Sequence, residues 1–171
     1  MLNLGIVFFL RERYGASPSL IGWFMSFSVL TYILSCLLLR PLFELLPYQV
    51  SLAIGVAGMP LFLLLLYLTP SLALTFLFSA LYRVALAFFW PPAMGWLSQG
   101  IEEDLLSRRQ SRFNLSWSTG LVSSFVLSGL ASERAAELPL LLSILIFTAN
   151  LVLLAACLAT FPRLRPSIRA V

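Results

Sequence analysis

The stretch LLPYQVSLAIGVAGMPLFLLLLYLTPSLALTFLFSALY, residues Leu45–Tyr82, contains no charged side chain. A helix that crosses the hydrocarbon core of a membrane needs about 20 mainly apolar residues, so this stretch is too long for one crossing and must turn once. The turn is expected at Thr69–Pro70–Ser71, because proline lacks an N–H donor and disfavours helical geometry in the residue before it. The stretch therefore predicts two spanning helices, near 48–68 and 71–98.

Three other uncharged runs predict further spans near 18–39, 113–131 and 138–160, the first of them starting at the helix-start signal Ser17–Pro18. None of the runs alternates apolar and polar residues as barrel strands do, which leaves helices as the spanning structure. Residues 1–10 are apolar, too few to span and without signal-peptide features, so they are expected to belong to a truncated first helix. The predicted fold is an all-α transmembrane bundle in which residues 1–171 form one domain.

The composition supports this fold class and excludes much chemistry. Of 171 residues, 60% are hydrophobic and 11% charged, and the mean hydropathy is +0.97, which a soluble domain of this size cannot bury. Histidine and lysine are absent, which excludes histidine relays, haem ligation by histidine and Schiff-base lysines. Cys36 and Cys157 are expected to be inert thiols within spans. No enzyme activity, catalytic residue, cofactor or metal site is predicted.

The arginines predict the topology. Connections alternate between the two faces of the membrane, so one face would carry seven arginines and the other three. By the positive-inside rule the richer face is cytoplasmic, which places the C-terminus on the cytoplasmic side of the cell membrane. The seven are Arg40, Arg108, Arg109, Arg112, Arg163, Arg165 and Arg169, and the three are Arg11, Arg13 and Arg134. The net charge of +4 is explained by these helix ends, so nucleic-acid binding is not expected. Residues 102–112 are expected to be a solvated connection or an interfacial helix.

Arg83 is the single arginine within a predicted span, where its insertion costs at least ~2.5–3.5 kcal/mol. It is interpreted as a charge that faces a water-filled translocation path, with snorkelling or a structural pair as the alternative. Trp90 follows on the same helical face, together with Ala87 and Met94. Pro91 and Pro92 free backbone carbonyls one turn earlier and are interpreted as a hinge, although prolines are common in membrane helices.

The span near 113–131 contains a small residue at every fourth position. This small-residue ladder, which predicts a helix-packing face, consists of Ser116, Gly120, Ser124 and Ser128. Asn114 and Trp117 stand beside it at the start of the span. Asn114 is a candidate for contact with a solute, and the capping of the helix start is the role that we favour for it. Trp117 is placed with it on the translocation path.

The order of these features resembles the N-terminal six-helix half of a major facilitator superfamily transporter, over nearly the whole chain. Arg11–Gly22 is similar to the family's outer loop and second-helix start, and Phe113–Gly120 resembles a fifth-helix start in some of its carriers. Arg83 matches an arginine of the family's fourth helix, but Leu86–Ala87 replaces the Gln-Gly pair that follows it there. Arg40–Pro47 replaces the family's gating loop, keeping one acid and losing the basic cluster that follows it.

The resemblance implies alternating access between two six-helix halves around a midplane site. This chain would be a half or partial transporter of a small solute, and its second half would come from a homodimer or from a separate or missing C-terminal half. The alternative is a non-transporting membrane subunit or assembly factor that binds partner helices through the small-residue ladder.

Overall fold

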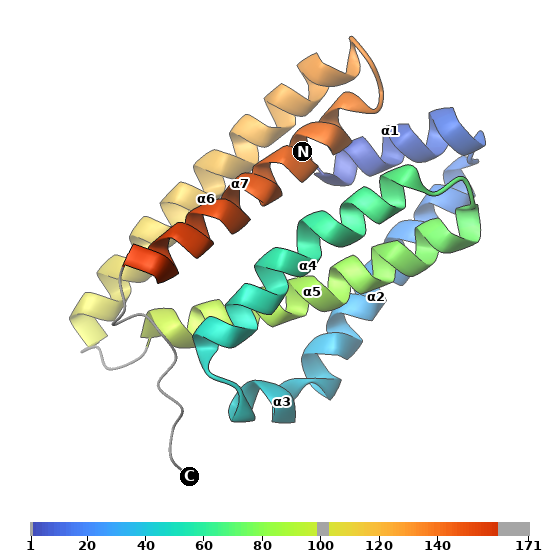
Figure 1. Ribbon diagram of the computed structural model, residues 1–171. Helices are drawn as coiled ribbons and strands as arrows, with labels where there is room; N and C mark the ends of the chain where they lie inside the picture. Colours follow the sequence, from blue (N-terminus) through green and yellow to red (C-terminus); the bar gives the residue numbers. More distant parts are fainter. Residues whose placement is uncertain (1, 99–102, 161–171) are drawn as a thin grey trace. The chain divides into compact units, whose positions relative to one another are not determined.

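The computed structural model describes residues 2–98 and 103–160 (Figure 1). All the regular structure in these residues is helical, which confirms the all-α prediction. The seven helices are α1 (Leu2–Tyr14), α2 (Pro18–Leu38), α3 (Arg40–Leu45), α4 (Tyr48–Leu68), α5 (Leu72–Ser98), α6 (Glu103–Ser132) and α7 (Leu138–Thr160). Four of them are long and apolar enough to cross a membrane, namely α2, α4, α5 and α7. The described residues therefore have the features of a multi-pass membrane protein.

Helix α6 is longer than the span predicted within it. It begins at Glu103 and continues without a break to Ser132. Its first turns carry charged residues and its later turns many serines, and it is not one of the four helices that are apolar enough to cross on composition alone. Residues 103–112 are thus helical and continuous with 113–131.

The turns between helices follow from local chemistry. Thr69 has extended backbone angles after α4, as expected for a residue before proline, and its hydroxyl accepts a hydrogen bond from the Ser71 N–H at 3.4 Å. Gly15 has a φ of +58°, a left-handed conformation that glycine adopts at little cost, and it separates α1 from α2. The Ser17 hydroxyl accepts a hydrogen bond from the Leu20 N–H at 3.3 Å, as an N-cap does.

Helix α3 has no counterpart among the predicted elements. A proline in its first turn suits the start of a helix, and the Arg40 side chain donates to the Glu44 carboxylate at 3.1 Å, one turn further on. Both side chains are exposed. Six residues are too few for a recognisable hydrophobic period, so this helix could not be predicted from the sequence pattern.

The described residues fall into two compact units. The first unit draws on Met1–Ile21 and Met94–Ser143, and the second on Gly22–Ala93 and Ile144–Val171. In the first unit α1 contacts α6, and Phe9, Leu10 and Leu140 are buried. The start of α7 packs against Gly5 so closely that a Cβ there would lie 2.9 Å from the Leu140 nitrogen.

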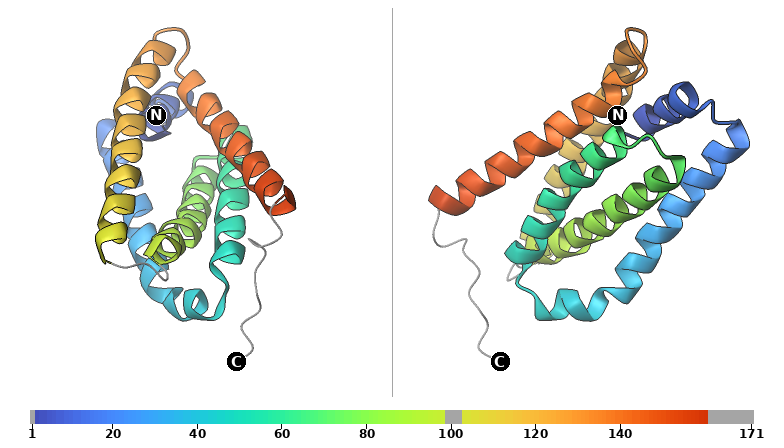
Figure 2. Two further views of the ribbon diagram at one scale, coloured as in Figure 1. Left: turned by 90° about the vertical axis from the view of Figure 1, so that its left-hand side faces the viewer. Right: turned by 45° about the vertical axis from the view of Figure 1, so that its right-hand side comes forward.

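The second unit is organised around α5, which lies beside both α4 and α2 (Figures 1 and 2). Helices α4 and α5 are tightly packed at two glycines of α4. A Cβ at Gly55 would lie 2.9 Å from the carbonyl oxygen of Ala85, and a Cβ at Gly58 would lie 2.8 Å from the Ala85 Cβ. Glycine therefore lets the two backbones come together, as small residues do where membrane helices pack. Leu63 and Leu66 are fully buried in the same unit.

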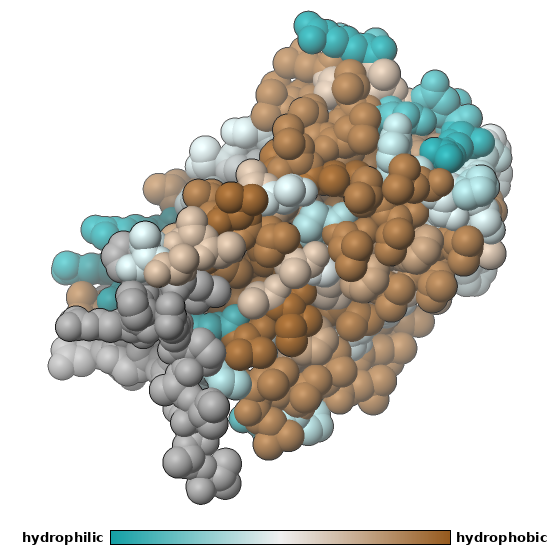
Figure 3. All heavy atoms as spheres, in the orientation of Figure 1, coloured by the Kyte–Doolittle hydropathy of each residue, from teal (hydrophilic) through white to brown (hydrophobic). Residues whose placement is uncertain are grey.

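The exposed surface is unusually apolar for a folded chain. On the face drawn in Figure 3, hydrophobic residues cover most of the surface. Large apolar side chains on the candidate spans are among the exposed ones, including Leu37, Leu38, Leu68 and Leu145. Soluble monomers rarely expose so much contiguous apolar surface, and lipid is the solvent that such a surface suits.

Candidate functional site

Arg83 lies well inside α5, as the twelfth of its 27 residues counted from Leu72. Its side chain is half-buried, and its Nε atom is buried without a hydrogen-bond partner among the described residues. The guanidinium carbon stands 5.8 Å from the centre of the Tyr82 ring, within the range of a cation–π contact. The tyrosine ring itself packs edge-on against Phe147 of α7, at 6.2 Å between centroids.

Helices α2 and α5 run parallel, and their contacts set the register around Arg83. The Ser28 and Ser79 hydroxyls form a buried hydrogen bond at 2.6 Å. One turn earlier, the rings of Phe24 and Phe76 meet edge-on with centroids 4.9 Å apart. One turn beyond the serine pair, the same register brings α2 to the level of Arg83.

The residue that α2 supplies at this level is Tyr32. Its side chain is close enough to Arg83, and to Cys36 one turn further along α2, for electrostatic interactions. Tyr32 and Cys36 are both half-buried. The Arg83 site therefore consists of Arg83, Tyr32, Tyr82 and Cys36.

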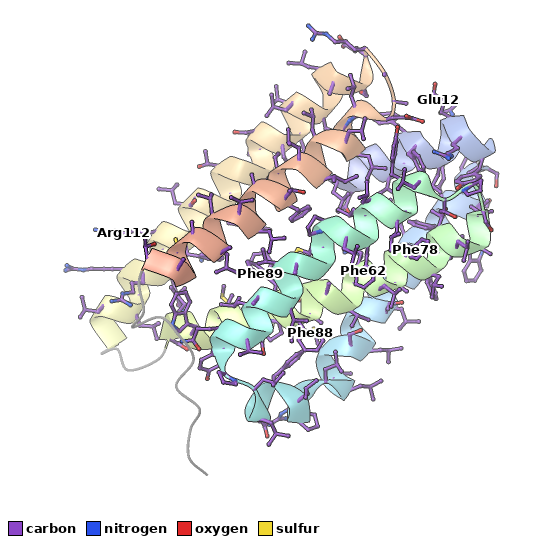
Figure 4. All side chains as sticks on the ribbon, in the orientation of Figure 1. Glu12, Phe62, Phe78, Phe88, Phe89 and Arg112 are labelled. Atoms are coloured by element: carbon purple, nitrogen blue, oxygen red, sulfur yellow. The ribbon has the colours of Figure 1, made fainter. Side chains whose placement is uncertain are left out.

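The Arg83 site carries a positive charge that nothing in the neighbouring spans balances. The four candidate spans contain no aspartate or glutamate. Glu12 and Glu44 lie on α1 and α3, both are exposed, and Figure 4 shows Glu12 pointing outward. An isolated guanidinium at this depth is costly and favours an anionic group beside it. In the described residues no group of three or more His, Cys, Asp or Glu side chains could hold a metal ion.

The other predicted residues of α5 lie near the site in sequence and differ in exposure. Ala87 is fully buried, whereas Trp90 is half-buried and packs edge-on against Phe89 at 5.5 Å. Pro91 is exposed and Pro92 buried, and α5 remains one helix through both. The hinge at these prolines stays a prediction.

Asn114 and Trp117 belong to the first unit, where both are exposed on α6. The favoured capping role of Asn114 is wrong, because α6 begins at Glu103 and Asn114 lies well inside it, where backbone N–H groups already have helical partners. The expected contact of either residue with a solute stays a prediction.

The small-residue ladder is half covered and half open. Ser128 is fully buried and Ser124 half-buried, whereas Ser116 and Gly120 are exposed. A Cβ at Gly120 would meet nothing within 4 Å. The open part of the ladder, Ser116–Gly120, is thus a surface on which a backbone from outside could approach.

The arginines of the predicted topology are partly described. Arg108, Arg109 and Arg112 are exposed on α6, and Figure 4 shows Arg112 projecting away from the helix. Arg163, Arg165 and Arg169 lie outside the described residues.

Sequence reasoning found Arg83 but missed the residues of α2 and α5 beside it. A signal was present: Ser28, Tyr32 and Cys36 recur at every fourth position of α2, and Ser79 stands one turn before Arg83. Hydroxyl groups are common in membrane helices, however, and each usually donates to its own backbone, as Thr31 does to the Phe27 carbonyl at 2.8 Å. Spacing alone could not show which of them face Arg83.

The chain matches no known family model, no curated protein and no solved structure. The resemblance to the major facilitator superfamily that the sequence suggests therefore stays a prediction.

Proposed function

We propose that this chain is one helical half of a secondary carrier that moves a small solute across the cell membrane by alternating access. The observation that carries the proposal is Arg83, which is the single charged residue inside the four candidate spans. Intramembrane ionisable residues are rare, and they mark substrate or ion pathways when they occur. The order of spans and turns, which resembles the N-terminal half of the major facilitator superfamily, supports the same function.

In this proposal the later part of α6 is a fifth span. Residues 113–132 carry no charge, and at 1.5 Å per residue they are about 30 Å long, the thickness of the hydrocarbon core. Arg112 and Arg134 flank this stretch at its two ends. The richer arginine cluster, at Arg108–Arg112, then lies in the cytoplasm. Reporter fusions after Arg109 and after Arg134 test this topology, and a cytoplasmic signal after Arg134 would contradict it.

The function is tested by transport measurements on cells or proteoliposomes that contain the full chain. Uptake and efflux of a panel of small anions and neutral solutes are compared between the wild type and Arg83→Ala, with the exposed Arg134→Gln as the matched control. Wild-type transport that falls at least tenfold in Arg83→Ala and persists in Arg134→Gln supports the proposal. Equal transport by all three proteins removes Arg83 from the mechanism.

A second candidate function is that of a non-transporting subunit that binds partner helices. The observation that favours it is the open part of the ladder, because Gly120 is exposed and a Cβ there would meet nothing within 4 Å. Leucine at Gly120 would block close approach of another helix. Gly22→Leu is the matched control, since Gly22 is also exposed with open space around it. If Gly120→Leu separates the chain from a co-purifying partner and Gly22→Leu does not, while no solute is transported, this second function holds.

A further inference from the structure

The charge of Arg83 needs a counter-ion that this chain does not supply within its spans. All seven acidic residues of the sequence lie outside the four candidate spans; they are Glu12, Glu44, Glu102, Glu103, Asp104, Glu133 and Glu137. A second copy of the chain would bring no carboxylate to the depth of Arg83 either. A balancing negative charge at this depth would therefore come from outside these four spans.

The contacts between α2 and α5 place a second hydrogen-bond donor at the same level. From the Ser28–Ser79 pair, one turn along each of the two parallel helices leads to Tyr32 and Arg83. The electrostatic interaction between Tyr32 and Arg83 agrees with this register. The neighbouring thiol, that of Cys36 one turn along α2, is at most a weak hydrogen-bond partner, so the Tyr32 hydroxyl remains available to a stronger acceptor.

The two side chains together suit an oxyanion. The guanidinium presents several N–H donors in one plane, and its Nε atom is buried without a partner among the described residues. The phenol adds one O–H donor from the opposing helix. The Tyr82 ring lies beside the guanidinium, with 5.8 Å between the guanidinium carbon and the ring centre, and provides an apolar side. A carboxylate has two oxygens, one of which can accept from Arg83 and the other from Tyr32.

We propose that Arg83 and Tyr32 form a water-accessible binding site for a small carboxylate-bearing anion. The claim that this anion is the transported solute rests on the proposed function. The claim that the site binds the anion does not. Lipid headgroups are excluded as its source, because Arg83 lies well inside a helix that spans the hydrocarbon core. A carboxylate of a partner protein would occupy the same donors and would keep small charged reagents out.

Cys36 offers a direct probe of the site, because it lies one turn from Tyr32 on the same face of α2. In the full chain with Cys157→Ser, Cys36 is the single thiol, and its rates of reaction with sulfonatoethyl and trimethylammonioethyl methanethiosulfonate are measured in proteoliposomes. Each rate is divided by the rate for a free thiol in solution. The matched control is Cys36→Ser, which leaves only the exposed Cys157 of α7.

We expect the anionic reagent to be favoured at Cys36 on the order of tenfold over the cationic reagent, because a nearby unit charge attracts one and repels the other. Arg83→Gln removes this preference and Arg83→Lys keeps it, whereas the reactivity of Cys157 responds to neither substitution. Acetate slows the anionic reagent at Cys36 more than the same concentration of sodium chloride does, and Tyr32→Phe weakens this protection. If Arg83→Gln does not fold, the ratio of the two reagents' rates at Cys36 in the protein with Arg83 intact still tests the proposal.

Three results would overturn the proposal. They are a Cys36 that neither reagent reaches, a reaction without charge preference, and an absence of protection by acetate beyond that of sodium chloride. The first result is also the one expected if a partner protein fills the site. The experiment does not depend on transport: charge-selective labelling without transport of any solute would contradict the proposed function and leave the anion site standing.

Discussion

Replacing Gly55 by alanine is expected to push α4 and α5 apart. The new Cβ would lie 2.9 Å from the Ala85 carbonyl oxygen, 3.0 Å from the Phe89 nitrogen and 3.1 Å from the Phe88 carbonyl carbon. All three are backbone atoms, so relief requires one whole helix to move by several tenths of an ångström rather than a side chain to rotate. A gap of about 0.5–1 Å already loses a quarter to a half of the dispersion energy at the contacts that it opens.

The expected magnitude follows from a matched comparison with Gly22→Ala. Overpacking in a tight interior costs about 1–3 kcal/mol. Alanine also favours the helix over glycine by about 0.8–1.0 kcal/mol, and this gain applies at both positions. A Cβ at Gly22 meets nothing within 4 Å, so only the propensity gain is expected there. The difference between the two variants isolates the steric term, and Gly55→Ala should be less stable than Gly22→Ala by about 1–3 kcal/mol.

The assay is reversible unfolding in mixed micelles of a mild detergent and dodecyl sulfate, followed by far-ultraviolet circular dichroism. A difference between the two variants below about 0.5 kcal/mol, the size of an ordinary surface effect, would refute the close approach of α4 and α5. A double-mutant cycle gives a second test. A Cβ at Gly58 would lie 2.8 Å from the Ala85 Cβ, so Gly58→Ala should destabilise alone and recover when combined with Ala85→Gly.

Three further substitutions test other contacts. Gly5→Ala should increase amide hydrogen exchange in α1, because its Cβ would lie 2.9 Å from the Leu140 nitrogen; unchanged exchange would contradict that packing. Ser79→Ala should lower the free energy of unfolding by roughly 0.6–2 kcal/mol, because it leaves the buried Ser28 hydroxyl unpaired. If the 2.6 Å bond between the two hydroxyls forms, the double variant with Ser28→Ala should recover part of this loss. Gly15→Ala should cost about 1–2 kcal/mol in the same measurement, and Gly15→Asn less, because φ is +58°; equal stabilities would argue against the left-handed turn.

The spanning helices could be predicted because hydropathy and chain breaks are local properties. The helices α4 and α5 begin and end within a residue of the predicted positions, on either side of Thr69–Pro70–Ser71. The start of α6 could not be predicted. Residues 103–112 are charged enough to form a solvated connection, and they are also rich in good helix formers. Composition alone therefore does not decide between an irregular connection and a helix. The capping role expected of Asn114 failed for this reason.

The sequence did not predict which helices pack against each other. Membrane helices are apolar on every side, so they lack the amphipathic stripe that identifies the buried face of a soluble helix. The ladder in α6 has the more regular spacing of small residues, yet Gly120 meets nothing within 4 Å, while Gly55 and Gly58 are the tightly packed glycines of the second unit. Many small residues occur in each helix, and spacing does not choose the partner.

The sequence by itself determined that this protein is helical, that several helices are long and apolar enough to cross a membrane, and that Arg83 is a charge within one of them. These conclusions depend on side-chain hydropathy along a single segment. Only the tertiary structure decided that Tyr32 of α2 lies at the level of Arg83, and that α4 meets α5 at Gly55. The physical reason is that these contacts arise from the register and close packing of separate helices, which are interactions between segments far apart in the chain.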